Sequence, residues 1–149
     1  MNDQDLCGKW TGEYIYGEEY AKPVRGKKVA FEVNITFNEG LVKGDCTDEE
    51  TTLYFKEPAL IEGSVAGHSI SFIKRYPHYW QNEEGGPRFL PKLPSQEIHY
   101  SGQFANGRFE GEWEVSTILN DGQGTVITGT GHWFMKKVEL SYQVNKLTS

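Results

Sequence analysis

The sequence predicts an all-β protein, an antiparallel up-and-down (meander) β-barrel of about eight strands. Two observations predict it: short runs in which apolar and polar residues alternate, and tight glycine turns between those runs. The clearest run is 29–37, whose residues on one face are Val29, Phe31, Val33, Ile35 and Phe37. No stretch carries apolar residues at helical spacing over three turns, so we expect little helix.

The eight predicted strands cover residues 8–16, 29–37, 41–46, 60–66, 68–75, 97–105, 108–116 and 124–137. Short turns join several of them and make consecutive strands antiparallel neighbours. Asn106-Gly107 is the strongest of these signals, because a type I′ turn needs positive φ at both central residues. Glycines inside strands, such as Gly111 and Gly131, are expected where a neighbouring tryptophan or tyrosine needs room.

The segment 76–95 interrupts this rhythm. It holds four of the six prolines and the aromatic cluster Tyr76-Pro77-His78-Tyr79-Trp80. We interpret it as a long loop without periodicity, either a lid over one barrel mouth or a subunit contact. With this loop included, residues 1–149 are expected to form a single barrel domain.

The composition limits which binding partners and which cellular compartment we expect. The net charge is −6 and no basic stripe is visible, so a nucleic-acid partner is not expected. No apolar run is long enough to span a membrane, and residues 1–5 lack the apolar core of a secretory signal. Cys7 and Cys46 form no CxxC pattern, so we expect reduced thiols and a cytoplasmic protein.

Motifs of catalysis are absent from the sequence. The four histidines have no metal-ligand spacing, and no nucleophile motif or phosphate-binding glycine loop occurs. His99 and His132 precede aromatic residues in strands, so each is expected to face outward when its neighbour faces inward. We therefore predict no metal, no cofactor and no catalytic residue, and the interpretation leans towards a protein that is not an enzyme.

The aromatic residues carry the candidate site. Strand phase directs five of them to the barrel interior: Trp10, Tyr14, Tyr100, Trp113 and Trp133. Together with Ile98 and with Trp80 of the long segment, they are the predicted ligand-binding residues. An eight-stranded barrel has room for packed side chains or for one small ligand, so these rings form either a core or a cavity wall.

Three runs resemble the avidin/streptavidin and lipocalin families of calycin-type barrels. Gly8-Lys9-Trp10 matches their GxW opening, and Tyr100-Ser101-Gly102-Gln103-Phe104 resembles the W-S-G-Q-Y run of avidin-like proteins. Gly131-His132, followed by Phe134 and Lys136, is similar to the closing GHDxFxK stretch of that family. The resemblance implies an eight-stranded barrel that binds a small molecule and often associates with itself.

The departures from the avidin pattern bear on the ligand. Gly12, Gln96, Ile98 and Trp133 stand where the resemblance requires polar partners for the ureido group of biotin. Each missing hydrogen bond to a buried ureido group costs about 1–3 kcal/mol. Biotin binding by the avidin mechanism is therefore not expected.

Three functions stay open at this point. The first is a non-catalytic barrel with an aromatic-lined cavity for a small hydrophobic or aromatic ligand. The second is a structural or interaction protein with a fully packed barrel. The third is a calycin-shaped isomerase or hydro-lyase. The aromatic content of segment 76–95 also favours a homo-oligomer.

Overall fold

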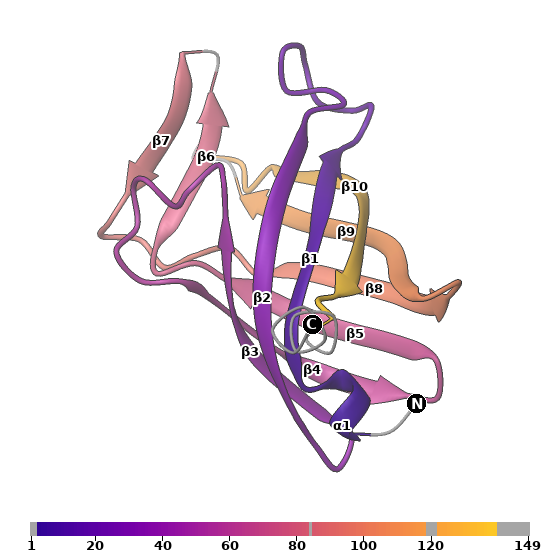
Figure 1. Cartoon of the computed structure of the whole chain (residues 1–149). Helices are drawn as coiled ribbons and strands as arrows, with labels where there is room; N and C mark the ends of the chain where they lie inside the picture. The colour runs from indigo at the N-terminus through magenta and orange to yellow at the C-terminus, as the bar shows by residue number, and fades with distance from the viewer. Residues whose placement is uncertain (1–2, 84, 119–121, 140–149) are drawn as a thin grey trace, which may run out of the picture.

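The computed structural model describes residues 3–83, 85–118 and 122–139. Its elements are α1 (Asp3–Leu6), β1 (Gly8–Tyr16), β2 (Lys28–Asn38), β3 (Leu41–Asp48), β4 (Ala59–Ala66), β5 (Ser69–Arg75), β6 (Tyr79–Glu83), β7 (Gly86–Leu90), β8 (Ile98–Ala105), β9 (Arg108–Ile118) and β10 (Val126–Lys137). Eight strands close into an antiparallel barrel in the order β1-β10-β9-β8-β5-β4-β3-β2 (Figure 1). The predicted up-and-down barrel is confirmed.

The barrel strands lie where the alternating pattern predicts them, with no boundary more than two residues away. Two-residue turns close the β2–β3 and β8–β9 hairpins. Asn106 and Gly107 have φ of 55° and 80°, the two positive values of a type I′ turn. In the β2–β3 turn Glu39 and Gly40 have φ of 52° and 83°, so this turn holds a glutamate at positive φ.

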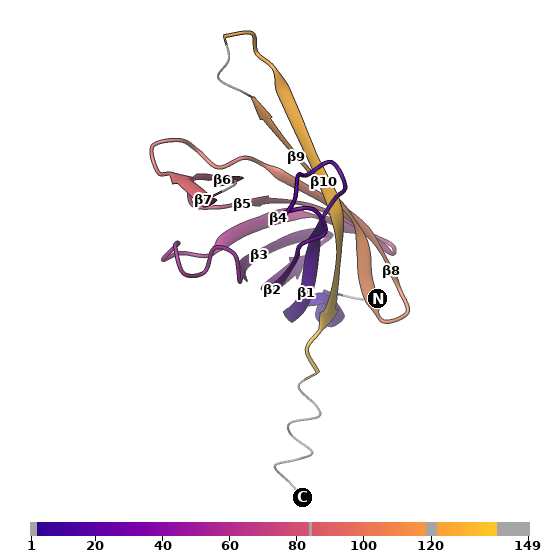
Figure 2. The ribbon, with the colours of Figure 1, turned by 90° about the horizontal axis from the view of Figure 1, so that it is seen from above.

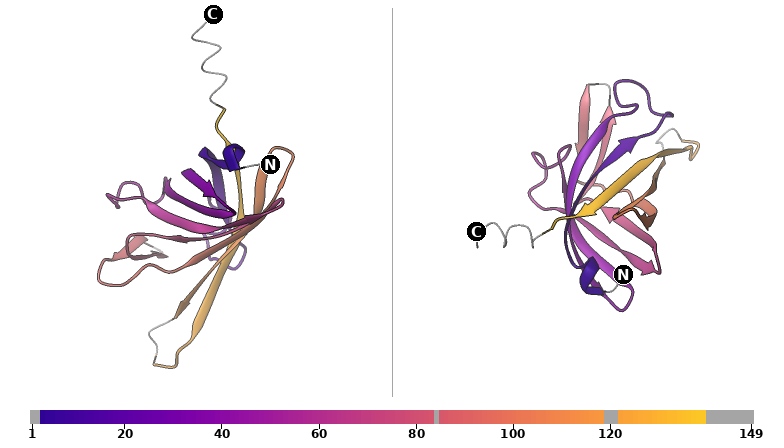
Figure 3. Two further views of the ribbon diagram at one scale, coloured as in Figure 1. Left: turned by 90° about the horizontal axis from the view of Figure 1, so that it is seen from below. Right: turned by 45° about the vertical axis from the view of Figure 1, so that its right-hand side comes forward.

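The segment 76–95 differs from its prediction as a loop without regular structure. Tyr79–Glu83 and Gly86–Leu90 pair as a two-stranded hairpin, β6–β7, inserted between β5 and β8. Each strand is five residues long and prolines flank or interrupt the segment, so no alternation was long enough to reveal it. Figures 1 and 3 show this hairpin at the end of the barrel opposite α1.

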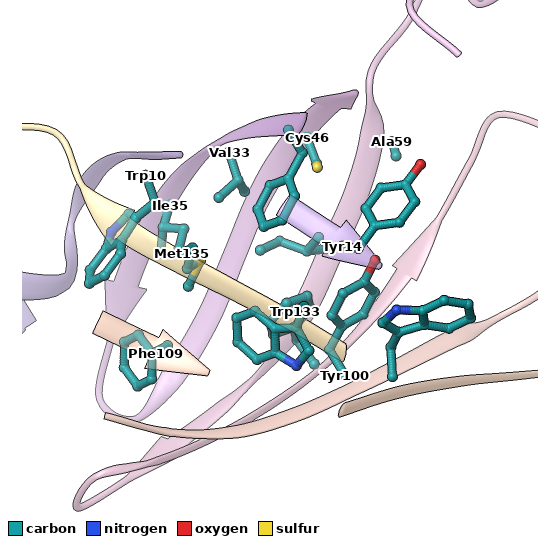
Figure 4. Close-up of a cluster of buried hydrophobic side chains, with 14 of the residues drawn as sticks. Trp10, Tyr14, Val33, Ile35, Cys46, Ala59, Tyr100, Phe109, Trp133 and Met135 are labelled. Carbon is teal, nitrogen blue, oxygen red and sulfur yellow. The ribbon is translucent and has the colours of Figure 1, made fainter. Parts of the chain in front are cut away.

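The barrel interior is built from alternate residues of each strand. Val29, Phe31, Val33 and Ile35 of β2 are all buried, as their shared face predicts. At the α1 end Trp10, Phe109 and Met135 lie close together and are almost entirely buried (Figure 4). Beside Phe72 and Tyr100 the interior holds a void of only about 10 Å³. This part of the barrel is a packed core.

Two tryptophans of the interior lie opposite glycines on the adjoining strand. Trp113 of β9 pairs with Gly131 of β10, and Trp133 of β10 pairs with Gly111 of β9. A Cβ on Gly131 would lie 2.0 Å from the carbonyl oxygen of Ile15 and 2.5 Å from the Trp113 ring. Gly131 therefore provides the room that the sequence predicts for a large ring. Gly102 does the same for Trp133, whose ring would lie 2.7 Å from a Cβ at that position.

The described residues include no helix that is long and apolar enough to cross a membrane. Both cysteines are free thiols. Cys7 accepts a hydrogen bond from the Phe37 amide at 3.3 Å, and Cys46 is buried in β3, where burial raises its pKa to about 11.

The first prediction concerns the glycine that faces Trp113. Gly131→Ala should destabilise the protein by about 1–3 kcal/mol, because its Cβ would collide with backbone and ring atoms that cannot both move. Urea denaturation measures this loss. Gly85→Ala is the matched control, since no atom lies within 4 Å of its Cβ position. Equal stabilities of the two variants would contradict the close-approach argument.

Candidate functional site

A cavity of about 160 Å³ opens at the end of the barrel that carries the β6–β7 hairpin. Its wall comes from β1, the β1–β2 loop, the segment after β5, β6, the start of β8, β9 and β10. The β9–β10 hairpin extends beyond the barrel at this end (Figure 2). Seven aromatic rings line it: Tyr14, Tyr16, Tyr20, Tyr76, Trp80, Tyr100 and Trp113. Larger hollows elsewhere lie on the outer surface and are lined by charged side chains.

Five of the seven sequence-predicted site residues meet at this cavity. They are Tyr14, Tyr100, Trp113, Ile98 and Trp80. Trp10 and Trp133 do not line it and lie deeper, in the packed core. Trp10 packs against Phe109 and donates from Nε1 to the Leu6 carbonyl at 2.8 Å. Trp133 lies between the Trp10–Phe109 pair and the cavity (Figure 4). Its ring packs edge-on against the rings of Phe72 and Tyr100.

Several wall residues were not predicted from the sequence. Tyr16 and Val115 follow Tyr14 and Trp113 by two positions, so the strand period alone could have identified both. Tyr20 lies in the β1–β2 loop and Tyr76 follows β5, so no periodic signal marks either of them. The positions of these two rings depend on tertiary structure.

A buried ion pair lies below the cavity. Lys74 Nζ is 3.1 Å from Asp48 Oδ2, and the two side chains are 2% and 0% exposed. Asp48 Oδ2 also accepts a hydrogen bond from the Tyr76 hydroxyl at 2.7 Å. Its Oδ1 accepts from the amide and the hydroxyl of Thr51 at 2.9 and 2.8 Å. Four donors thus compensate the cost of burying this carboxylate.

The ammonium of Lys74 also lies over two rings of the cavity wall. Its Nζ is 4.8 Å from the Tyr14 ring centroid and 4.7 Å from that of Tyr76. These cation–π contacts occupy one face of each ring with a positive charge that belongs to the protein.

Both members of the pair are ionised at neutral pH. Burial alone raises the pKa of Asp48, but Lys74 and the donated hydrogen bonds outweigh it and hold the pKa below its usual value. Burial alone lowers the pKa of Lys74, but its surroundings raise it well above its usual value. These surroundings are Cys46, Tyr100, Tyr76 and Asp48.

A second carboxylate connects the cavity wall to the hairpin. Glu50 accepts hydrogen bonds from the hydroxyls of Tyr14, at 2.7 Å, and Tyr16. Lys27 Nζ lies 2.9 Å from its other oxygen, and Asn82 of β6 donates to Tyr16 at 2.8 Å and to Glu50 at 3.4 Å. The network thus joins β1, the loop after β3 and the β6–β7 hairpin.

The hairpin itself forms one wall of the cavity. Trp80 packs edge-on against Tyr76 and stacks on Phe89, with ring centroids 5.5 and 5.7 Å apart. The amide of Gln96 donates to the Trp80 carbonyl at 2.7 Å, which fixes β6 against the start of β8. Trp80 is therefore part of the buried core as well as of the cavity wall.

The tyrosine hydroxyls of the wall are neutral at neutral pH. Burial, followed by neighbouring tyrosines and carboxylates, raises the pKa of Tyr14 and Tyr16 well above the usual value. Burial also raises the pKa of Tyr76 well above the usual value, although the charge of Lys74 opposes it. The same cause raises the pKa of Tyr20 to about 12. These phenols can donate hydrogen bonds, but they are poor general bases near pH 7.

Within the described ranges, no group of three or more His, Cys, Asp or Glu side chains could hold a metal ion. His99 and His132 are exposed on the outer face of the barrel, as their strand phase predicts. The wall offers rings and hydroxyls to a ligand.

No protein-family model, no curated protein and no solved structure matches this chain. The chemistry of the cavity therefore carries the functional argument.

The second prediction compares two tryptophans. Trp133→Ala should cost about 3–5 kcal/mol of unfolding free energy, because core atoms surround the ring. Trp113→Ala should cost less, about 2–3 kcal/mol, because one side of its ring faces the cavity and has no packing partner to lose. Chemical denaturation measures both. A loss at Trp113 equal to that at Trp133 would mean that the cavity is filled by the protein itself.

The third prediction concerns the ion pair. Lys74→Met should destabilise the protein by about 3–5 kcal/mol, because Asp48 would stay buried without its counter-charge. Adding Asp48→Asn to Lys74→Met should recover part of that loss. Unchanged stability of the single variant in urea denaturation at pH 7 would show that the pair is not buried.

The fourth prediction follows from the lowered pKa of Asp48. Its stabilising contribution is complete above the unfolded-state pKa of about 3.9 and is lost as pH falls through the folded value. Below about pH 4, the wild type should therefore lose stability more steeply than the Lys74→Met/Asp48→Asn double variant. Parallel pH profiles of thermal unfolding would contradict this account.

Proposed function

We propose that this protein binds a small, largely apolar ligand in the cavity beneath the β6–β7 hairpin. One observation carries the proposal. The barrel is packed at one end down to a void of about 10 Å³, yet seven aromatic rings surround about 160 Å³ at the other. Cores of natural proteins rarely leave space of this size unfilled, so a hollow lined by rings favours a ligand.

The volume limits the size of the ligand. A cavity of about 150 Å³ lined by apolar side chains is large enough for benzene. Sites for drug-sized molecules have volumes of about 300–1,000 Å³. The ligand is therefore a molecule built on a single ring, in keeping with the small hydrophobic or aromatic ligand that the sequence predicts.

Polar groups of the site support binding over catalysis. Asp48 and Lys74 neutralise each other, and Glu50 is held by Lys27 and two tyrosine hydroxyls. A general base or acid needs a pKa near the working pH, and the raised tyrosine pKa values do not provide one. An isomerase or hydro-lyase is therefore the weaker candidate.

The resemblance to avidin-like and lipocalin-like barrels supports the proposal only by analogy of fold. A closed eight-stranded up-and-down barrel is compatible with it. A cytoplasmic location and self-association stay predictions. Phe89 of the hairpin stacks on Tyr54 and packs edge-on against Phe55. This ring is therefore covered within the chain and needs no second subunit to pack against.

Native mass spectrometry of protein purified from its own host tests the proposal, because a ligand held in the cavity travels with the protein. Val115→Phe should remove the retained mass. Val115 is a wall residue of β9 that pairs with Gly129 of β10, and the larger phenylalanine side chain would occupy part of the cavity. Val65→Phe is the matched control, a half-buried valine on β4 away from the cavity. For protein isolated free of ligand, the same variants are compared by calorimetric titration with indole. Equal binding by wild type and Val115→Phe would contradict the proposed site.

The fifth prediction concerns biotin. A Cβ at Gly12 would lie 1.8 Å from the Phe134 carbonyl oxygen, so no larger polar side chain fits there. Ile98 presents carbon atoms, and the Gln96 amide is engaged by Trp80. Without the polar partners that the avidin mechanism uses at these positions, biotin should bind no more tightly than other small ring compounds. Nanomolar affinity in isothermal titration calorimetry would show that this interpretation is wrong.

A further inference from the structure

The hydroxyl of Tyr100 differs from the other deep hydroxyls of the cavity wall. Those of Tyr14, Tyr16 and Tyr76 each donate to a carboxylate. Within the described part of the chain, Tyr100 Oη forms no hydrogen bond, although the residue is only 4% exposed. Tyr20 shares this feature, but its ring is half-buried at the rim.

The ring of Tyr100 is fixed by its neighbours. It stacks on Phe72 with a centroid distance of 4.8 Å and an interplanar angle of 9°. On another side it meets the edge of Trp133 at 5.6 Å. Because packing holds the ring, the hydroxyl cannot turn away to find a partner elsewhere in the protein.

The hydroxyl faces the cavity. Among the described residues, no side-chain oxygen or nitrogen that is shut off from solvent lacks a hydrogen-bond partner, so Tyr100 Oη must be accessible to a water-sized probe. Tyr100 lines two spaces, and the small void beside Phe72 and Lys74 exposes no polar atom. The remaining space is the 160 Å³ cavity. A buried hydroxyl that faces the cavity and has no partner in the protein is stabilised by a hydrogen bond to a bound ligand.

The charges around Tyr100 indicate which partner suits it. Burial is the main cause that raises its pKa, and Lys74 is the strongest of the charges that act on it, in the opposite direction. The net result is a raised pKa, so the phenol keeps its proton at neutral pH and has an O–H to donate. Cys46, Asp48 and Glu50 oppose Lys74 more weakly. The best partner is therefore a hydrogen-bond acceptor.

The same charges disfavour an ionised ligand. The Lys74 ammonium already lies over the Tyr14 and Tyr76 rings, so a second cation would meet a like charge. A carboxylate would lie near the buried Glu50 and would have to give up its hydration, while the nearby ammonium groups of Lys27 and Lys74 are already paired with Glu50 and Asp48. An uncharged acceptor avoids both costs.

We propose that the ligand is an uncharged single-ring aromatic or heteroaromatic molecule with a carbonyl-type acceptor that receives a hydrogen bond from Tyr100 Oη. The ring lies among the aromatic side chains of the wall, and the acceptor points towards β8. This inference rests on the proposed function, since it names the ligand class of the same cavity.

Two probes of nearly the same shape test it. Acetophenone carries the carbonyl, and α-methylstyrene replaces that oxygen with a CH₂ group. Affinities are measured by NMR titration for wild type, Tyr100→Phe and Tyr54→Phe, a control that removes the hydroxyl of an exposed tyrosine outside the cavity. Tyr100→Phe should weaken the binding of acetophenone by about 3- to 10-fold and leave the binding of α-methylstyrene unchanged. Tyr54→Phe should change neither.

The outcomes separate this inference from the proposed function. If both probes bind and Tyr100→Phe affects them equally, the acceptor assignment is wrong and the cavity still binds ligands. Tighter binding of benzoate or phenyltrimethylammonium than of acetophenone would also overturn the assignment. If none of these probes binds, the proposed function fails together with the inference.

A second measurement needs no variant and covers the case in which Tyr100→Phe fails to fold. The infrared carbonyl stretch of bound acetophenone should lie below its value in hexane, because the hydrogen bond weakens the C=O bond. A stretch at the hexane position would mean that Tyr100 makes no hydrogen bond to the ligand.

Discussion

The buried Lys74–Asp48 ion pair is the interaction on which the arrangement of the barrel interior depends. It lies between a core filled by Trp10, Phe109 and Met135 and a cavity surrounded by rings. A buried pair is costly to desolvate and is stable only when its remaining hydrogen-bonding groups are satisfied. Here those groups come from the loop after β3 and from Tyr76, so satisfying the pair also fixes the floor of the cavity.

Two carboxylates close together in the sequence organise the open end. Asp48 ends β3 and holds β5 through Lys74, whereas Glu50 holds β1 through Tyr14 and Tyr16 and β6 through Asn82. Their tyrosine donors, Tyr76 for Asp48 and Tyr14 and Tyr16 for Glu50, are part of the cavity wall. The rings are therefore oriented by hydrogen bonds on one side, which keeps them from collapsing into the space between them.

Strand phase made most of the fold predictable, because one face of each strand is apolar and the turns carry glycine. The same phase could have marked Lys74, which follows Ile70 and Phe72 at two-residue spacing and must therefore face inward. Its partner could not be predicted, since Asp48 lies 26 residues earlier and only barrel closure brings the two together. The β6–β7 hairpin was missed because its strands are short and their pairing depends on Trp80 packing at the cavity.

The hairpin end of the barrel is proposed to hold a ligand with a single ring. A crystal soaked in iodobenzene tests it most directly, because anomalous scattering locates the iodine without prior phases. We expect an iodine peak inside the cavity, between the Trp113 and Tyr100 rings. Iodine bound only on the outer surface, with Trp80 or Trp113 folded into the cavity, would contradict it.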